Sequence, residues 1–546
     1  MPSSVQGVLA ARLAQLSTRA REIANVAAVI GREFTFPVLA RASGKEEESV
    51  VLGLDELWQR RMVREQAAGT PNAYDFSHGK LREQIYVSLS PIQRRLLHQR
   101  VAEALKALYS EELDSISGQI AAHYEQAGSV GQAITFYQRA ATAASRLYAH
   151  SEARYALERA VSLFSTPQPG PGTPKVAWET MASVYVALGD VLAEINAFEE
   201  ARKAYQQALT AIPLAAEFWR ARLHWKLATT WVFAVDQDLD SWRVHAQPEF
   251  MEAERILHAM ADHDTPEWRE EWIALQFAHI WPRRNSAEDM LAAIEKARPL
   301  VEQHGSPRQR RLLAESIGIY NAVHERYVIP AQRIIAWRER LAALEPSADE
   351  AQRGIDLTVL GIGLWCASQF DEAEEQLNAA LQIGERTGNA WLQNNCLTFL
   401  SLVYRRRGQV EAMRQLLVQA QAAGVAQQNS IFSGHQAWLA WRAGDLEQAE
   451  SYGRAALLQD RYQLFRTNAF MWTGRWPLIG IALIQERYAA ASAEIRLLFD
   501  TIQQPPPAPL EDLLQAALRA WDDGKQNEAS SLMQSAVPLA EQLGYL

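Results

Sequence analysis

Arginine and tryptophan residues gather in the last third of this 546-residue sequence, and their chemistry is that of a binding site. Arg405 and Arg406 stand in a run of three arginines, and Trp438, Trp441 and Arg442 follow one helical segment later. A guanidinium donates paired hydrogen bonds to an anion and stacks on an indole face. Such a group could hold an anion, a carboxyl group or a planar ligand. The alternative is that the indoles fill a helical core and the arginine run is a solvated turn.

Motifs for catalysis and for nucleotide binding are missing from the sequence. A P-loop needs an upstream glycine and a Ser or Thr directly after its Gly-Lys pair, so that it can wrap a phosphate. The pairs Gly44-Lys45 and Gly524-Lys525 satisfy neither condition. No nucleophile stands at a suitable spacing from a base, and the histidines share no helical face. We therefore predict no enzyme activity, no cofactor and no metal.

Composition narrows the class of protein. The net charge is −10, whereas nucleic-acid binding by the whole chain would need a basic surface. The two cysteines, Cys366 and Cys396, have no partner at metal-ligand spacing, so neither a disulfide scaffold nor a zinc site is expected. No apolar run is long enough to span a bilayer. We expect a soluble, cytoplasmic protein that does not contact a membrane.

The elements that must hold these residues are clearest at 185–213, where two helices meet at a short corner. Small and large apolar residues recur there at helical spacing, and a proline ends the second helix. Small residues let two antiparallel helices approach closely while large ones fill the remaining space. The pattern resembles the tetratricopeptide repeat. Its positions are Tyr185, Leu188, Gly189, Leu192, Ala201, Tyr205, Ala208 and Pro213.

The same pattern recurs along most of the chain. It is present at 118–140, loosens after 213 and returns from Gly361 onward. The small positions of successive second helices in this later part are Ala373, Met413, Ala449, Ala491 and Ala529. Such pairs must stack to bury both faces. We predict an all-α protein, an α-solenoid forming a tetratricopeptide-like superhelix with a concave inner wall.

A different architecture is predicted for residues 1–110. Helices over 5–16, 18–30, 37–42 and 46–60, an extended piece at 33–36, and two strands at 62–66 and 73–76 predict a winged-helix domain with a two-stranded wing. Connecting helices at 79–89 and 91–109 lead out of it. We place the first repeats at 111–164, a Pro/Gly-rich linker or loop at 165–175, and the main repeat array at 176–546.

The N-terminal region also resembles a known family. The phrases LAQLSTRAREIANVAAVIGREFTF, LDELWQRRMVRE and YDFSHGKLREQIYVSLSPIQRRLLH are similar to bacterial STAND signalling ATPases, including regulators that resemble the maltose-regulon activator. The resemblance covers roughly residues 3–165. It implies a winged helix that follows a nucleotide-binding domain and precedes a repeat sensor array. It also implies that His78 contacts a bound nucleotide, but only with the ATPase domain that this sequence lacks. Within this chain alone, His78 beside an N-capping Ser77 is the alternative.

By resemblance to the tetratricopeptide repeat, the first helix of each repeat lines the concave wall. From this mapping the candidate ligand-binding residues are Trp365, Arg405, Arg406, Trp438, Trp441 and Arg442, with Asn395 and Trp476 nearby. We expect a non-catalytic sensor and scaffold segment of a signal-transduction regulator. It would bind a protein, peptide or small effector there and relay binding through the winged helix.

A second hypothesis is a DNA-binding transcriptional regulator that uses the winged helix. The candidate recognition helix at 46–60 is acidic, with Glu46, Glu47, Glu48, Asp55 and Glu56, and its basic residues come only at the end. Reading base edges calls for Arg, Lys, Asn or Gln on that helix. Its composition therefore disfavours nucleic acid as a partner.

Overall fold

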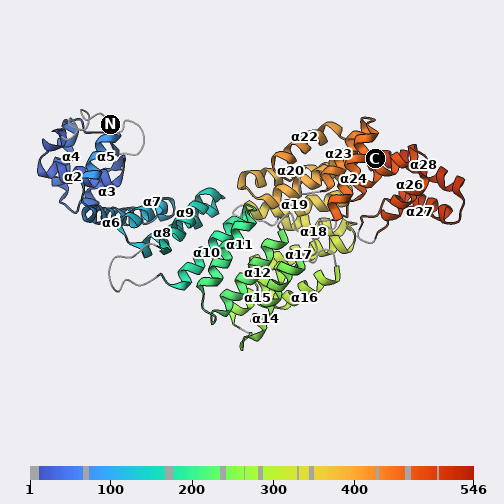
Figure 1. The fold of residues 1–546 in the computed structure, drawn as a ribbon, viewed down its shortest axis with the longest axis horizontal. Helices are drawn as coiled ribbons and strands as arrows, with labels where there is room; N and C mark the ends of the chain where they lie inside the picture. The colour runs from blue at the N-terminus through green and yellow to red at the C-terminus, as the bar shows by residue number, and fades with distance from the viewer. Residues whose placement is uncertain are drawn as a thin grey trace. The chain divides into compact units, whose positions relative to one another are not determined.

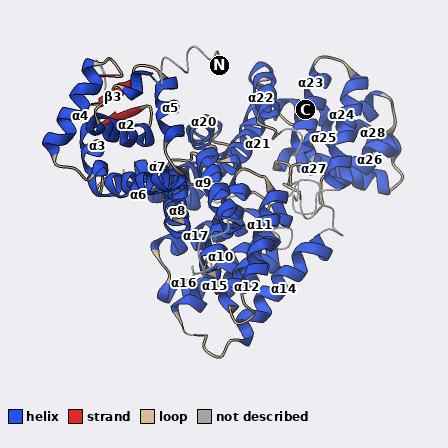
Figure 2. Cartoon of the chain, turned by 60° about the vertical axis from the view of Figure 1, so that its left-hand side comes forward, coloured by secondary structure: helices blue, strands red, loops and turns tan. Residues whose placement is uncertain are grey.

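In a computed structural model of the chain, most residues lie in helices (Figures 1 and 2). The structure describes residues 11–65, 73–165, 176–233, 242–263, 265–280, 287–328, 331–342, 350–425, 430–461, 469–500 and 503–546. The chain divides into two compact units, Met1–Val191 and Leu192–Leu546. The division falls inside helix α10 (Trp178–Glu194), whereas we predicted domain boundaries after residues 110, 164 and 175. Those boundaries stay predictions, and the linker at 165–175 lies almost wholly outside the described residues.

The first unit begins with a small sheet enclosed by helices. Figure 2 shows its strands in red among the helices near the N-terminus. The order of the strands is β1-β3-β2, and both pairings are antiparallel. The elements are α2 (Thr18–Ile30), β1 (Glu33–Thr35), α3 (Phe36–Ser43), α4 (Glu47–Gln59), β2 (Val63–Glu65) and β3 (Ala73–Phe76).

The two predicted strands at 62–66 and 73–76 are present as the antiparallel pair β2 and β3, and a third strand, β1, joins them in the sheet. The extended piece Glu33–Thr35 pairs with β3, with Glu33 opposite Asp75 and Thr35 opposite Ala73. Strand β3 would otherwise present one edge of unpaired backbone groups, and β1 satisfies that edge. The helices at 18–30, 37–42 and 46–60 are confirmed to within a few residues. The helix predicted at 5–16 begins outside the described residues.

Helices α5 to α9 follow in the first unit, and α6 to α9 pack in succession. Four positions of the predicted repeat at 118–140, Ala121, Tyr124, Ala133 and Tyr137, are buried between α7 and α8. The sequence pattern therefore located the first helix pair correctly. The bounds are α5 (Gly79–Ser88), α6 (Pro91–Leu108), α7 (Leu113–Ala127), α8 (Val130–Arg146), α9 (His150–Ser162) and the 3₁₀ turn η1 (Leu163–Ser165).

The second unit is a series of helices, most of which pack against the next one along the chain. Its first part contains α11 (Phe198–Ala211), α12 (Glu217–Phe233), the π-helical turn η2 (Trp242–Ala246), α14 (Gln247–Ala259), α15 (Pro266–Ile280), α16 (Ala287–His304), α17 (Pro307–His324) and α18 (Ala331–Ala342). Its second part contains α19 (Glu350–Cys366), α20 (Phe370–Thr387), α21 (Ala390–Arg406), α22 (Val410–Ala422), α23 (Ser430–Arg442), α24 (Leu446–Arg461), α25 (Trp472–Ile484), α26 (Tyr488–Leu497), α27 (Ala508–Asp522) and α28 (Gln526–Gln542).

The second helix of each pair from α20 onward is anchored at the position that the repeat pattern predicted. Ala373, Met413, Ala449, Ala491 and Ala529 all have no exposed surface. Each lies near the start of its helix, in α20, α22, α24, α26 and α28. A small or slender residue there lets the paired helix approach closely, which is the physical basis of the pattern. The second unit is thus a tetratricopeptide-like helical repeat array.

First helices of neighbouring pairs also touch one another in this part of the array. Helix α19 contacts α21, α21 contacts α23, and α23 contacts α25. These helices therefore form one row, on which side chains from successive repeats lie next to each other. In the described part of the chain, no helix is both long enough and apolar enough to cross a bilayer.

Candidate ligand-binding site

Arg405 lies near the end of α21 and is completely buried. Its Nη1 donates to the carbonyl oxygens of Gly434 at 3.1 Å and Thr473 at 2.8 Å, and its Nη2 donates to that of Tyr545 at 2.6 Å. The rings of Trp438 and Trp472 flank the guanidinium, with centroids 5.7 and 5.2 Å from Cζ. Arg405 therefore joins α21 to α23, to α25 and to the segment that follows α28.

The positive charge of Arg405 is held without a carboxylate partner among the described residues. Burial lowers the pKa of its guanidinium, yet an arginine starts from so high a value that it keeps its proton. Three carbonyl dipoles and two indole faces supply the negative potential that water would otherwise provide. Its Nε has no hydrogen-bond partner in the structure. The site thus retains an unused, buried N–H donor.

Arg406 is half-buried and contacts the same segment from the neighbouring position. Its Nε donates to the carbonyl of Leu543 at 2.9 Å, and its Nη1 donates to the hydroxyl of Tyr545 at 3.1 Å. Its guanidinium also lies over the Tyr545 ring, 4.5 Å from the centroid, and over the ring of Phe370 at 5.5 Å. Burial raises the pKa of Tyr545, so its phenol stays neutral and accepts this hydrogen bond. The run of arginines is therefore not simply a solvated turn, because only Arg407 is exposed.

The predicted tryptophans are mostly buried. Trp365, Trp438 and Trp476 have almost no exposed surface, and the indole nitrogen of each lacks a hydrogen-bond partner in the structure. Trp365 packs edge-on against Phe399 and Phe470. These indoles are part of the core between the first helices of the array. Their roles as ligand contacts stay predictions.

The other predicted residues are more accessible. Trp441 is half-buried, and its Nε1 donates to an oxygen of Glu541 at 3.4 Å. Arg442 is exposed at the end of α23. Asn395 is half-buried and donates to the carbonyl of Trp391, one turn earlier in α21, at 2.9 Å. The structure therefore brings Arg405, Arg406 and Trp438 together around one point, and it leaves Asn395 and Arg442 outside that group.

Three residues of this site, Trp472, Gly544 and Tyr545, are absent from the set predicted from the sequence. Trp472 lies 4.6 Å from the ring of Tyr545, and Gly544 packs against the backbone of Arg406. Trp472 had no repeat position to mark it, and Gly544-Tyr545 follows the last repeat. Gly544 also has a φ of +72°, the left-handed conformation that glycine adopts after a helix. A glycine two residues beyond the end of α28 was the signal that the sequence offered.

His78 is exposed and occupies the N-cap position of α5. Its side chain forms no capping hydrogen bond. The alternative role for Ser77 as the N-cap is wrong, because His78 holds that position and the Ser77 hydroxyl instead donates to the carbonyl of Arg61, between α4 and β2, at 2.8 Å. The nucleotide-sensing role of His78 stays a prediction.

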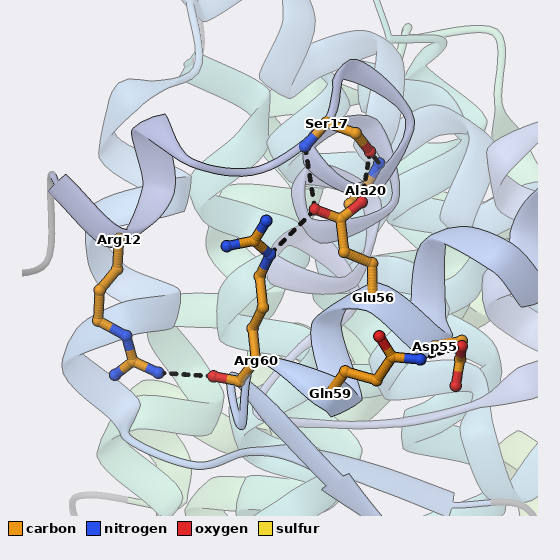
Figure 3. Close-up of polar contacts among 7 residues, drawn as sticks. All are labelled: Arg12, Ser17, Ala20, Asp55, Glu56, Gln59 and Arg60. Carbon is orange, nitrogen blue, oxygen red and sulfur yellow. Dashed lines mark hydrogen bonds and ion pairs between the residues drawn. The ribbon is translucent and has the colours of Figure 1, made fainter.

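The acidic residues of α4 divide into structural and exposed ones. Figure 3 shows the Glu56 carboxylate turned toward the start of α2, where Ser17 donates to it through its amide at 3.1 Å and its hydroxyl at 2.5 Å. These bonds from Ser17, more than Arg60, lower the pKa of Glu56. Asp55 accepts only from Gln59 of the same helix, at 2.7 Å, among the contacts in that view. Glu56 is thus occupied in positioning α2.

Among the described residues, neither the surface hollows nor the groups of metal-ligating side chains form a second binding site as well defined as the one around Arg405. A hollow of about 450 Å³ in the first unit is lined by polar and charged side chains together with Tyr124. Among the described residues, no group of three or more His, Cys, Asp or Glu side chains is placed to hold a metal ion. The remaining residues of the hollow are Gln99, Glu103, Lys106, Ala107 and Gln132.

Comparisons with known proteins give partial likenesses. No protein-family model matches the chain. An uncharacterized protein of Rhizobium meliloti (strain 1021) is 32% identical over 162 residues, which are 30% of this chain and 16% of that protein, so the chain spans about a sixth of that relative's length.

Three solved structures resemble the chain in their arrangement of helices. A STAND protein with a tetratricopeptide repeat sensor from Pyrococcus horikoshii has a TM-score of 0.45 and 12% identity, over 90% of this chain and 65% of that one. The APC/C hetero-tetramer Cut9-Hcn1 has a TM-score of 0.31 and 14% identity, over 83% of this chain and 93% of that one. Yeast Tom70 has a TM-score of 0.34 and 10% identity, over 81% of this chain and 94% of that one. At these scores nothing about function carries over.

Proposed function

We propose that this chain is the non-catalytic sensor and scaffold segment of a signal-transduction regulator. Its repeat array binds a protein, peptide or small effector, and its N-terminal domain relays that binding to a nucleotide-binding domain. The observation that carries the proposal is the row of first helices α19, α21, α23 and α25, each in contact with the next. Such a row offers one continuous surface to an extended partner, which is how repeat proteins recognise their ligands.

The N-terminal domain supports the relay part of the proposal. Its order of elements, α2-β1-α3-α4-β2-β3 with a three-stranded antiparallel sheet, is compatible with a winged helix. Val51, Leu52 and Trp58 on α4 expose 48, 49 and 55% of their surface. Apolar side chains that are this exposed on one helix suit contact with another protein domain. We assign that contact to the nucleotide-binding domain.

The acidic character of α4 argues for a protein partner over DNA. Glu47, Glu48 and Asp55 are exposed along the helix that would enter the major groove. Carboxylates there would repel phosphates, and only cytosine offers them a donor. Tight, salt-sensitive binding of duplex DNA by the intact chain, measured by gel shift, would establish the DNA-binding alternative instead.

A display experiment tests the proposed function. A library of linear peptides is selected on the immobilised intact chain, and the enriched peptides are measured by fluorescence anisotropy. We expect one peptide to bind per chain, with affinity that falls at least tenfold in Trp441→Ala. Arg454→Ala is the matched control, since Arg454 is exposed on a second helix and pairs only with Glu450 in the structure. Failure to enrich any peptide that binds the chain, or equal binding by both variants, would contradict the proposal.

A further inference from the structure

The segment Leu543–Leu546 returns from the end of α28 to helices that lie far earlier in the second unit. Its hydrogen bonds reach Arg405 and Arg406, 137 to 140 residues away in the sequence. In a linear repeat array each pair contacts its neighbours, so a contact that passes over several pairs is not part of the stacking itself. We infer that Leu543–Leu546 is an intramolecular ligand, and that Arg405 and Arg406 belong to a peptide-binding site that it fills. This inference rests on the proposed function, because it names the kind of peptide that the array binds.

The helices that touch the segment form the row that we propose for ligand binding. Arg405 and Arg406 of α21 donate to the segment, and Trp472 and Trp476 of α25 face its tyrosine ring. Trp441 of α23 bonds Glu541 of α28, just before the segment. Helices α21, α23 and α25 are the first helices of three successive pairs and contact one another in turn. The segment therefore contacts two first helices of the row, α21 and α25, rather than the two helices of one pair. This is the position that an external peptide would take.

Backbone recognition comes from the two arginines. Arg405 donates to the carbonyl of Tyr545 at 2.6 Å, and Arg406 donates to the carbonyl of Leu543 at 2.9 Å. Both bonds are charge-assisted and need only a peptide carbonyl as acceptor. They would hold any chain in this conformation, whatever its side chains. They account for affinity and not for sequence preference.

Sequence preference comes from Tyr545 and Gly544. The Tyr545 ring is almost completely buried, lies beneath the Arg406 guanidinium, and faces Trp472 at 4.6 Å and Trp476 at 6.4 Å. Its hydroxyl accepts from Arg406. A Cβ at Gly544 would stand 2.3 Å from the carbonyl oxygen of Arg406, where no side chain fits. The site therefore selects a glycine followed by a tyrosine.

The local conformation adds a further requirement. The amides of Tyr545 and Leu546 both donate to the carbonyl of Ala540, at 2.8 and 3.3 Å, and close the end of α28 around the left-handed Gly544. This is the arrangement in which a glycine ends a helix. The ligand class is thus the glycine-capped end of a helix that carries a tyrosine directly after the glycine. A partner protein with such an end would compete with the chain's own segment.

Competition binding tests this inference. The probe is a fluorescent peptide with the sequence of residues 535–546, SAVPLAEQLGYL. A tethered segment acts at an effective concentration of the order of millimolar, so it should weaken the binding of this peptide to the intact chain, where only a tighter peptide could displace the segment. We expect the peptide to bind a chain ending at Gln542 at least tenfold more tightly than the intact chain. Peptides with alanine in place of the glycine or the tyrosine should bind the shortened chain at least tenfold more weakly.

Paired arginine variants of the shortened chain locate the site. Arg406→Gln should weaken the peptide at least tenfold, because it removes two hydrogen bonds and the contact with the tyrosine ring. Arg407→Gln is the control, since Arg407 pairs with Asp371 and Glu374 and not with the segment. Equal effects of the two substitutions would overturn the inference.

A full-length variant guards against loss of folding in the shortened chain. Tyr545→Ala removes the ring without shortening the chain, and it should admit the peptide if the segment is a displaceable ligand. If neither chain folds, as judged by circular dichroism, the segment is a structural lock and the inference is wrong. It is also wrong if a folded chain of either kind fails to bind the peptide. Display-selected peptides that still bind such a chain would leave the proposed function standing and refute only this inference.

Discussion

At the scale of single residues, the most telling group is a charge placed where water cannot reach it. Arg405 is wholly buried, and its hydrogen bonds go to the carbonyl oxygens of Gly434, Thr473 and Tyr545. Arginine suits this position because its planar fork reaches acceptors in different directions and stacks between rings. Lysine could not reproduce both the fork and the stacking. The residue explains why segments so distant in sequence meet at one point.

Glu56 carries a prediction at the same scale, since one carboxylate receives both donors of Ser17 (Figure 3). We expect Glu56→Gln to destabilise the start of α2 by about 1 kcal/mol, because the charge that strengthens both bonds is lost. Faster hydrogen exchange of the first amides of α2 would report it. Asp55→Asn is the matched control, as Asp55 bonds only Gln59 in that view. Comparable exchange in the two variants would show that Glu56 does not position α2.

At the scale of elements, the close approach of paired helices depends on positions where any added atom has no room. A Cβ at Gly361 of α19 would stand 2.6 Å from Cγ of Leu377 in α20, and Leu377 is completely buried. A Cβ at Gly318 of α17 would meet its nearest neighbour, in Trp337, at an ordinary 3.6 Å. The two glycines therefore differ in packing although both lie within helices.

These two glycines give the second prediction. Gly361→Ala should lower the free energy of unfolding by about 1–3 kcal/mol, because the pair α19 and α20 must separate to admit the methyl group. Gly318→Ala should be neutral or slightly stabilising, since alanine favours a helix over glycine. Urea unfolding of both variants, followed by circular dichroism, measures the difference. Equal losses would mean that close helix approach is not what anchors the repeat.

A buried histidine pair gives the third prediction, between α6 and α7. His98 Nε2 lies 2.9 Å from the hydroxyl of Tyr86, and the Nδ1 atoms of His98 and His123 are 2.9 Å apart. Burial, followed by the charge of Arg82, lowers the pKa of His98 from 6.5 to about 4. Burial, followed by His98, lowers that of His123 from 6.5 to about 4. The folded pair therefore stays neutral at pH values where unfolded histidines take up protons.

The sign of the pH dependence follows from these lowered values. Because only the unfolded state gains protons between about pH 6.5 and 4, acidification across this window should destabilise the first unit, by roughly 3 kcal/mol for one histidine. Above about pH 7 the pair should contribute no pH dependence. Unfolding of the first unit, followed by hydrogen exchange of α6 and α7 at a series of pH values, measures the slope. His123→Gln should flatten it, and an unchanged slope in that variant would assign the effect to other groups.

At the scale of the whole molecule, local pattern predicted the helices, and it failed where distant segments meet. The burial of Ala373, Met413 and Ala529 followed from spacing alone, because each reports contact with the adjacent helix. The contact between Arg406 and Tyr545 joins residues 139 apart, and no local periodicity encodes it. Likewise, the pairing of Glu33–Thr35 with β3 could not be predicted because it depends on which edge of the sheet the folded chain leaves free.

The candidate site was predicted in part for the same reason. The structure places Arg405 against Trp438, and Arg406 against the same C-terminal segment that Arg405 contacts, while their role in ligand binding stays a prediction. The sequence could not distinguish an exposed indole from a buried one, because both fit the first helix of a repeat. Trp365 and Trp476 are therefore more deeply buried than a surface contact would be. The segment Leu543–Leu546 lies outside the repeat pattern, and only its glycine, Gly544, gave a signal in the sequence.

The central claim is that the row of first helices in the second unit is a recognition surface. The most direct measurement is photo-crosslinking of a display-selected peptide to the intact chain, with the attachment sites mapped by mass spectrometry. We predict that the crosslinks fall on α19, α21, α23 and α25 and diminish when unlabelled peptide is added in excess. Crosslinks confined to the first unit, or spread over both units without competition, would contradict the claim.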